Sequence, residues 1–124
     1  MKIDSIKQIR LLDGVVQYLS KGNSWKPFRN SIQNRTGNLI LELADEGTYI
    51  RLNNADASTV TITNLPFEIG ATIVIEQTGA GAIQVLGSGV TVNGYSYTSG
   101  QYGVVQLIKV GDLIWTVIGG VESV

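Results

Sequence analysis

The chain has 124 residues and a mass of 13.3 kDa, enough for one domain and too short for two independent hydrophobic cores. It contains no His and no Cys, which excludes Ser-His-Asp and Cys-His catalysis, zinc sites built from these residues, and disulfide bonds. Charged residues make up only 15% of the chain, against about 25% in an average soluble domain, and this composition does not fit an intrinsically disordered protein.

Charge is distributed unevenly along the chain. Residues 1–36 carry seven Lys or Arg against two Asp, a net of +5, whereas residues 37–68 have a net of −4 and residues 69–124 a net of −2 from only four charges. Free monomers are normally rich in surface charge. We therefore expect copies of the same chain to cover much of residues 69–124; the alternative is a β surface of Gly, Ser, Thr and Asn.

Residues 1–33 predict a β meander. Asp13-Gly14 lies between two apolar runs, which is the strongest short signal for a β-hairpin, and a return strand over 24–28 completes the meander. The alternative is a short helix at the start of the segment. A ribbon of this size is barely stable alone, so we expect it to lie against the main domain, a neighbouring subunit or a partner.

Residues 34–124 show the alternation of β-strands, in short β-branched runs separated by Gly, Asn, Asp and Ser. The clearest expected strands cover residues 39–43, 59–63, 72–77, 83–86 and 113–119. A tight Gly111-Asp112 turn joins two strands, and Pro66 places 63–67 in a loop. The pattern predicts an all-β fold: an antiparallel, jelly-roll-like β-sandwich over 34–124, with the β-hairpin or meander before it.

The chain shows no motif of an enzyme, a phosphate-binding loop or a metal site. Asp45 and Glu46 precede Gly47 and predict a solvated turn rather than a catalytic carboxylate pair. Asn54 and Asp56, near Asn53, predict local Asx-turn hydrogen bonds rather than a calcium site. We expect no enzymatic activity, no metal and no cofactor. We also expect no membrane span, because no run approaches about 18 apolar residues, and no secretion signal.

Two groups of residues are candidates for binding. Six basic and aromatic residues in the first segment are candidates for attachment to an acidic protein surface; they are Lys2, Lys7, Arg10, Trp25, Lys26 and Phe28. The isoelectric point of about 5.2 and the lack of a nucleic-acid-binding module argue against nucleic acid as the partner. Tyr95, Tyr97 and Tyr102 lie in a polar Gly/Ser-rich stretch, where they fit either stacking on a sugar or contacts between subunits.

Four segments resemble bacteriophage head-fibre and capsid decoration proteins, which are related to the β-sandwich domains of phage tail fibres. They are IRLLDGVVQYLSKGNSWKPF (9–28), EGTYIRLNNADASTVTIT (46–63), GATIVIEQTGAGAIQVLGSGVTVNG (70–94) and GQYGVVQLIKVGDLIWTVIGG (100–120). Each motif consists mostly of Gly and β-branched residues, and their order and spacing carry the resemblance.

The resemblance implies a homotrimeric structural protein of the virion, made in the host cytoplasm and located on the capsid surface. Residues 1–33 would attach to the major capsid protein or another virion protein, and residues 34–124 would form the trimerisation domain. The alternative is a tail-fibre or baseplate receptor-binding protein that adheres to a host surface glycan. The family supplies no catalytic residues.

Overall fold

The computed structural model describes residues 9–12, 15–19, 25–27 and 31–124, with side chains for the last of these ranges. The chain divides into two compact units, residues 1–30 and residues 31–124. The division falls three residues before the expected boundary after residue 33, because β4 (Ser31–Arg35) pairs with a strand of the larger unit.

The smaller unit is a three-stranded antiparallel sheet. Its strands are β1 (Ile9–Leu12), β2 (Val15–Leu19) and β3 (Trp25–Pro27), in the order β1-β2-β3. Leu12 pairs with Val15 across the position of the predicted Asp13-Gly14 turn. The strands agree with the predicted meander, and the residues of both turns lie outside the described part of the chain.

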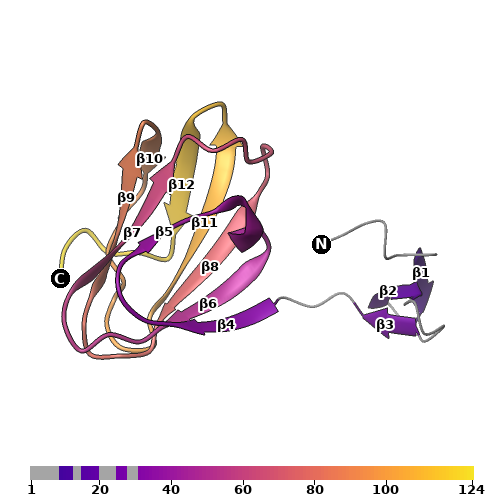
Figure 1. The fold of residues 1–124 in the computed structure, drawn as a ribbon, viewed down its shortest axis with the longest axis horizontal. Helices are drawn as coiled ribbons and strands as arrows, with labels where there is room; N and C mark the ends of the chain where they lie inside the picture. The colour runs from indigo at the N-terminus through magenta and orange to yellow at the C-terminus, as the bar shows by residue number, and fades with distance from the viewer. Residues whose placement is uncertain (1–8, 13–14, 20–24, 28–30) are drawn as a thin grey trace. The chain divides into compact units, whose positions relative to one another are not determined.

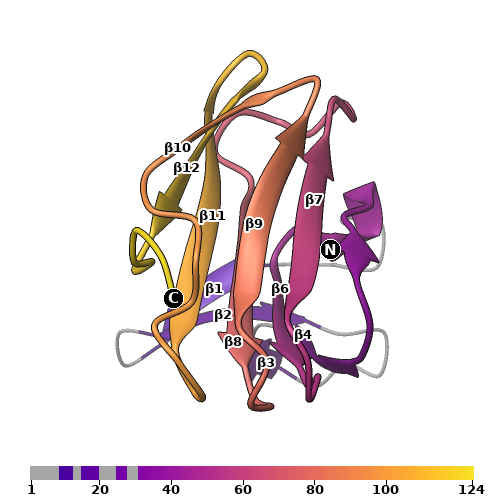
Figure 2. The ribbon, with the colours of Figure 1, turned by 90° about the vertical axis from the view of Figure 1, so that its left-hand side faces the viewer.

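The larger unit consists of two sheets packed face to face. After β4 come β5 (Leu39–Ile40), the short 3-10 helix η2 (Leu43–Asp45), β6 (Thr48–Leu52), β7 (Ser58–Thr63), β8 (Thr72–Gln77), β9 (Ile83–Ser88), β10 (Thr91–Asn93), β11 (Val104–Gly111) and β12 (Ile114–Ile118) (Figure 1). One sheet has six strands in the order β10-β12-β11-β8-β6-β4, and the other has three in the order β5-β7-β9. Figure 2 looks onto β7 and β9, with the larger sheet behind them.

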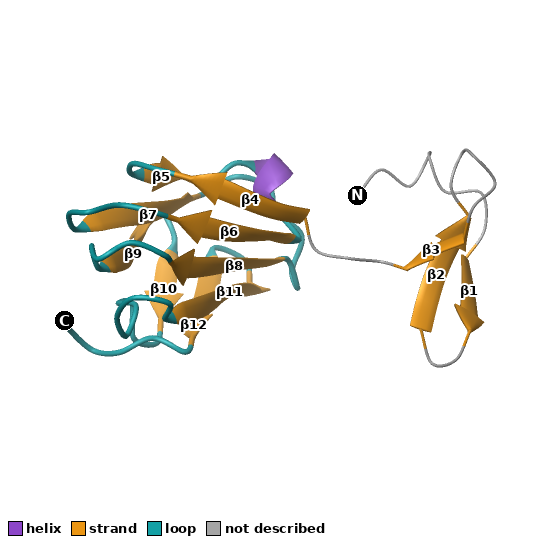
Figure 3. Ribbon diagram, turned by 90° about the horizontal axis from the view of Figure 1, so that it is seen from below, coloured by secondary structure: helices purple, strands orange, loops and turns teal. Residues whose placement is uncertain are grey.

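Successive strands alternate between the two sheets, so the chain winds as a β-solenoid. In the six-stranded sheet β4, β6 and β8 pair in parallel, and in the three-stranded sheet β5, β7 and β9 do the same (Figure 3). The all-β class is confirmed, but the predicted antiparallel, jelly-roll-like sandwich is wrong. The reason is that short corner turns carry the chain from one sheet to the other, and each strand then pairs with the strand one coil away.

The coils have an internal offset of 25 residues. Ile50 pairs with Ile75 in one sheet, and Val60 pairs with Val85 in the other. An offset in the range of about 20–50 residues is the usual signature of a solenoid. Only part of the side-chain pattern repeats, because Leu52 of one coil is matched by Gln77 of the next.

An antiparallel hairpin ends the winding. β11 pairs with β8 and with β12, and β10 then pairs in parallel with β12. Gly111 pairs with Ile114, so the turn residues are Asp112 and Leu113, one position later than the predicted Gly111-Asp112 pair. Leu113 has a φ of 55° and is exposed, so it belongs to the turn and not to the inward face of β12.

The core lies between the two sheets. It is formed by Leu41, Ile50, Leu52, Val60, Ile62, Phe67, Ala71, Ile73, Ile75, Ile83, Val85, Val105, Leu107, Trp115 and Val117. Phe67, in the loop predicted from Pro66, packs edge-on against Trp115 with ring centroids 5.2 Å apart. Ile73 and Ile75 point inward from β8, as their alternation predicted.

Asp45 corrects the prediction of a solvated turn. It is only 3% exposed, and its carboxylate forms an ion pair with Arg35. Its Oδ2 also accepts a hydrogen bond from the backbone N–H of Glu42 at 2.8 Å. The carboxylate therefore stabilises the first coil, while Glu46 is exposed.

Candidate functional site

The outer face of the six-stranded sheet is largely apolar and open to solvent. The strand registers place Ile32, Tyr49, Val74, Gln106 and Ile118 in one row across five strands. The two ends of this row are the most open, with Ile32 59% exposed and Ile118 49% exposed. Contiguous apolar surface of this kind usually marks an interaction site on a soluble protein.

The charges on this outer face are a single compensated pair. Arg51 Nε lies 3.1 Å from Glu76 Oε1, and Tyr49 Oη donates to the same oxygen at 3.2 Å. Burial raises the pKa of the Tyr49 hydroxyl above its ordinary value, and the hydrogen bond to the Glu76 carboxylate raises it further. The face therefore presents no net charge to a partner.

A polar groove lies at the end of the solenoid where the chain turns from the larger sheet into the smaller one. It consists of two adjoining hollows that share Asn38, Ala57 and Ser58. The groove is lined by Gly37, Asn38, residues 54–59, Ala82, Gln84, Tyr97 and Val124. The hollows have volumes of about 210 and 350 Å³. We call this region the polar groove.

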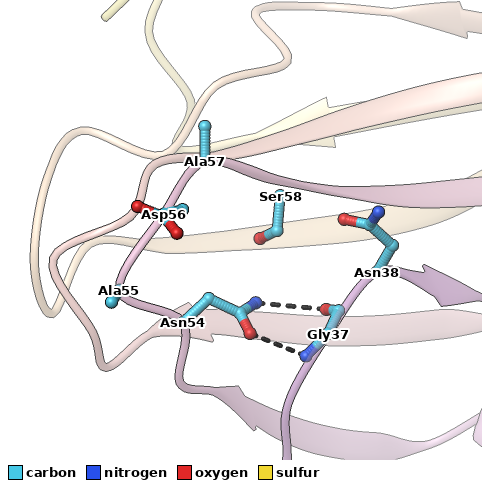
Figure 4. Close-up of a pocket in the computed structure, with 7 residues that line it drawn as sticks. All are labelled: Gly37, Asn38, Asn54, Ala55, Asp56, Ala57 and Ser58. Atoms are coloured by element: carbon cyan, nitrogen blue, oxygen red, sulfur yellow. Dashed lines mark hydrogen bonds between the residues drawn. The ribbon is translucent and has the colours of Figure 1, made fainter.

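Stacked turns build the walls of the polar groove. Asn54 Oδ1 accepts a hydrogen bond from the Gly37 N–H at 2.6 Å, and Asn54 Nδ2 donates to the Gly37 carbonyl at 3.1 Å (Figure 4). Asn38 Oδ1 accepts from the Thr59 N–H at 3.0 Å. On the other side, Gly81 N–H donates to the Asn54 carbonyl, and a Cβ at Gly81 would lie 1.9 Å from the Asp56 carbonyl oxygen. Glycine is needed here because the two turns approach so closely.

Ser58 forms part of the lining of both hollows, and its hydroxyl has no partner. The residue is 7% exposed, and its Oγ is the one buried side-chain polar atom among residues 31–124 without a hydrogen bond. Figure 4 shows this oxygen directed toward the space between Asn54, Asp56 and Asn38. A buried hydroxyl normally finds a partner, so this one is unusual.

A buried network holds the segment that carries Tyr97. Thr98 Oγ1 donates to Gln77 Oε1 and accepts from the Ile83 N–H at 3.0 Å. Gln77 Nε2 donates to the Gly79 carbonyl at 3.1 Å. Tyr97 itself forms backbone bridges to Gln84 and to Val121. The position of the Tyr97 side chain is therefore set by the core of the solenoid.

The predicted binding residues lie in different places. Tyr97 lines the polar groove, whereas Tyr95 and Tyr102 are 58% and 63% exposed and do not line it. Tyr97 forms only isolated bridges and no regular strand links it to Tyr95, so the two do not share a strand face as their spacing suggested. Arg10 lies in β1, and Trp25 and Lys26 lie in β3. The other three attachment candidates, Lys2, Lys7 and Phe28, lie outside the described residues.

Sequence reasoning missed Asn38, Ser58 and Gln84, which line the polar groove. It also predicted local hydrogen bonds for Asn54, whose side chain instead reaches a residue 17 positions earlier. The 25-residue offset was the available signal, because it places successive corner turns, and hence these residues, at the same end of the solenoid.

No protein-family model matches this chain, and no curated protein matches it. In the described part of the chain, no helix has the length and apolar character required to cross a membrane. The same residues contain no cluster of three or more His, Cys, Asp or Glu suited to a metal ion. Function is therefore inferred from the two surfaces and their chemistry.

Proposed function

We propose that this chain is a structural virion protein of a bacteriophage: a trimeric capsid decoration or head-fibre protein, held on the capsid exterior by residues 1–33. The observation that carries the self-association is the apolar outer face of the six-stranded sheet. The virion context comes from the resemblance of four segments to phage fibre and decoration proteins.

A second copy of this chain is the partner that the outer face fits. Arg51 and Glu76 neutralise each other, so identical faces do not repel one another. Ile118, Ile114 and Val104, from β11 and β12, are each at least 39% exposed. These residues belong to the charge-poor part of the sequence, whose surface is short of solvating groups unless it is covered.

The basic first segment suits attachment to an acidic capsid surface. Residues 1–36 carry a net charge of +5, and electrostatic complementarity speeds and orients docking. A protein that binds only the assembled shell stabilises the shell by mass action. In a trimer, three attachment segments act together, and their avidity exceeds the affinity of one.

The trimer is tested by light scattering coupled to gel filtration. The wild-type protein is expected near 40 kDa, three times the 13.3 kDa of one chain. Ile118→Lys places a charge on the outer face and is expected to produce monomer. The matched control is Ile40→Lys, which alters an isoleucine of β5 that is 68% exposed and should leave the trimer intact. A wild-type monomer at micromolar concentration would contradict the proposal.

The attachment role is tested with the fragment 31–124, which is a compact unit with its own core. We expect this fragment to remain trimeric and to stop co-sedimenting with capsids that lack the protein. The full-length chain, added to the same capsids, is the control. Co-sedimentation of the fragment at the full-length level would disprove attachment through the first segment.

Adhesion to a host glycan from a tail fibre or baseplate is the second candidate function. One observation favours it: Tyr97, one of the three tyrosines considered for sugar contact, lines the polar groove. Gold-labelled antibody on intact particles separates the two functions, since labelling of the capsid supports decoration and labelling of the tail supports adhesion.

A further inference from the structure

We infer that the polar groove is a binding site for an uncharged saccharide. The inference concerns residues 37–124 alone and does not depend on whether the protein is located on a capsid or a tail. None of the residues that line the groove lies on the outer face of the six-stranded sheet, so trimer formation and ligand binding use different surfaces.

The charges of the groove select a neutral ligand. Asp56 is the only ionisable side chain among the lining residues that bears a charge at neutral pH, and no Lys or Arg lines the groove. An anion such as phosphate would meet a carboxylate without a compensating cation. A divalent cation would find one carboxylate, whereas calcium sites use six to eight oxygen ligands.

The polar groups of the groove match the hydroxyls of a sugar. Amides of Asn38 and Gln84 and the hydroxyls of Ser58 and Thr59 lie on its surface or floor. Asn38 Oδ1 is engaged by the Thr59 N–H, and its Nδ2 forms no hydrogen bond within residues 31–124. Sugar hydroxyls both donate and accept, so they can pair with amide and hydroxyl groups alike.

Ser58 provides the observation that points to a ligand. Its Oγ is buried, has no partner and is directed into the groove (Figure 4). Leaving such a group unpaired costs about 1–3 kcal/mol. A sugar hydroxyl placed over Ser58, with a small displacement of the rim, would satisfy this hydrogen-bonding group.

Tyr97 supplies an aromatic surface at the other end of the groove. The ring of a tyrosine is apolar on its faces and polar at its hydroxyl, which suits a sugar with a C–H face and a hydroxyl edge. The backbone bridges of Tyr97 and the Thr98–Gln77 hydrogen bond fix the segment before a ligand arrives. Such preorganisation reduces the entropy lost on binding.

The groove has the size of a small ligand site. The larger hollow has a volume of about 350 Å³ and adjoins the smaller one of about 210 Å³. Small-molecule sites commonly have volumes of about 300–1,000 Å³. The groove therefore suits one or two sugar units rather than a long chain.

The test is a titration of the full-length protein, followed by NMR of its backbone amides. The probes are glucose, galactose, mannose, rhamnose and N-acetylglucosamine, with inorganic phosphate and calcium as charged probes. We expect at least one neutral sugar at millimolar concentration to shift the signals of Asn38, Ser58 and Gln84, and the charged probes to leave them unchanged.

Two variants separate binding from folding. Tyr97→Ala should weaken binding of the responding sugar about tenfold, while Tyr95→Ala, the same change at a tyrosine outside the groove, should leave binding unchanged. Ser58→Ala should weaken binding several-fold without lowering the melting temperature, because the hydroxyl it removes has no partner in the protein. The inference is overturned if no neutral sugar shifts the groove signals, if phosphate or calcium shifts them instead, or if both tyrosine variants behave alike.

Discussion

Asn54 pairs with Gly37 as one backbone amide pairs with another across a sheet. The side-chain Oδ1 accepts the Gly37 N–H and the side-chain Nδ2 donates to the Gly37 carbonyl, at 2.6 and 3.1 Å. The two residues are 17 positions apart in the sequence, in the corner turns of successive coils. The side chain thus continues, around the corner, the hydrogen bonding that joins β4 to β6.

Replacing Asn54 by Ala should loosen this corner. The change removes two hydrogen bonds that are partly open to water, so we expect the free energy of unfolding to fall by about 1–2 kcal/mol. The measurement is urea denaturation followed by circular dichroism. Asn93→Ala is the control, because Asn93 is exposed on β10 and should change stability by less than about 0.5 kcal/mol. Equal effects of the two variants would show that the Gly37 contacts contribute nothing.

Thr98→Val should destabilise the protein more strongly, by about 2–3 kcal/mol. Valine has nearly the shape of threonine, but it leaves the buried Gln77 Oε1 and the Ile83 N–H without their partner. Differential scanning calorimetry measures the loss. Thr61→Val on the outer side of β7 is the matched control and should be nearly neutral. A Thr98→Val protein as stable as the wild type would mean that this network is not required.

Lys109 is a buried cation whose worth can be measured by two substitutions. It is 7% exposed, and its Nζ donates to the Phe67 carbonyl at 2.7 Å, with no ion pair formed among residues 31–124. Lys109→Met keeps the packing of the stem and removes the buried charge, so stability should stay within about 1 kcal/mol of the wild type. Lys109→Ala should cost about 2–4 kcal/mol, because it leaves a cavity. If both variants lose the same stability in urea denaturation, the ammonium group and not the stem is what matters.

Tyr49 should make stability fall at alkaline pH. Its pKa is raised in the folded protein, first by burial and then by the hydrogen bond to Glu76, so the folded state retains the proton over a pH range in which the unfolded state loses it. The stabilisation is complete below the ordinary tyrosine pKa of about 10 and declines as pH rises from there through the higher folded-state pKa. Ultraviolet absorbance titration should show a late-ionising tyrosine that is absent in Tyr49→Phe.

Glu76→Gln tests the second cause of that pKa shift. It removes the carboxylate beside the hydroxyl, so the pKa of Tyr49 should move back toward its ordinary value while the effect of burial remains. Glu122→Gln, at an exposed position, is the control and should leave the titration unchanged. An unaltered late ionisation in Glu76→Gln would assign the whole shift to burial.

Local patterns were sufficient for the strands and their inward faces. The alternation of β8 predicted that Ile73 and Ile75 face the core, because side chains of a strand point alternately to its two sides. The same rule cannot tell a parallel neighbour from an antiparallel one. The winding depends on whether the turn after a strand reverses the chain, as at Asp112-Leu113, or carries it to the other sheet, as at 53–57.

The candidate sites show the same division. Composition alone indicated a charge-poor surface in residues 69–124 and excluded chemistry that needs His or Cys. Only the tertiary structure brought Arg35 to Asp45, Gly37 to Asn54 and Tyr97 to Ser58, since each contact depends on the coils stacking one upon the next. A sequence determines where each side chain points along its own strand, whereas the packing of coils decides which distant side chains meet and which hydroxyl is left without a partner.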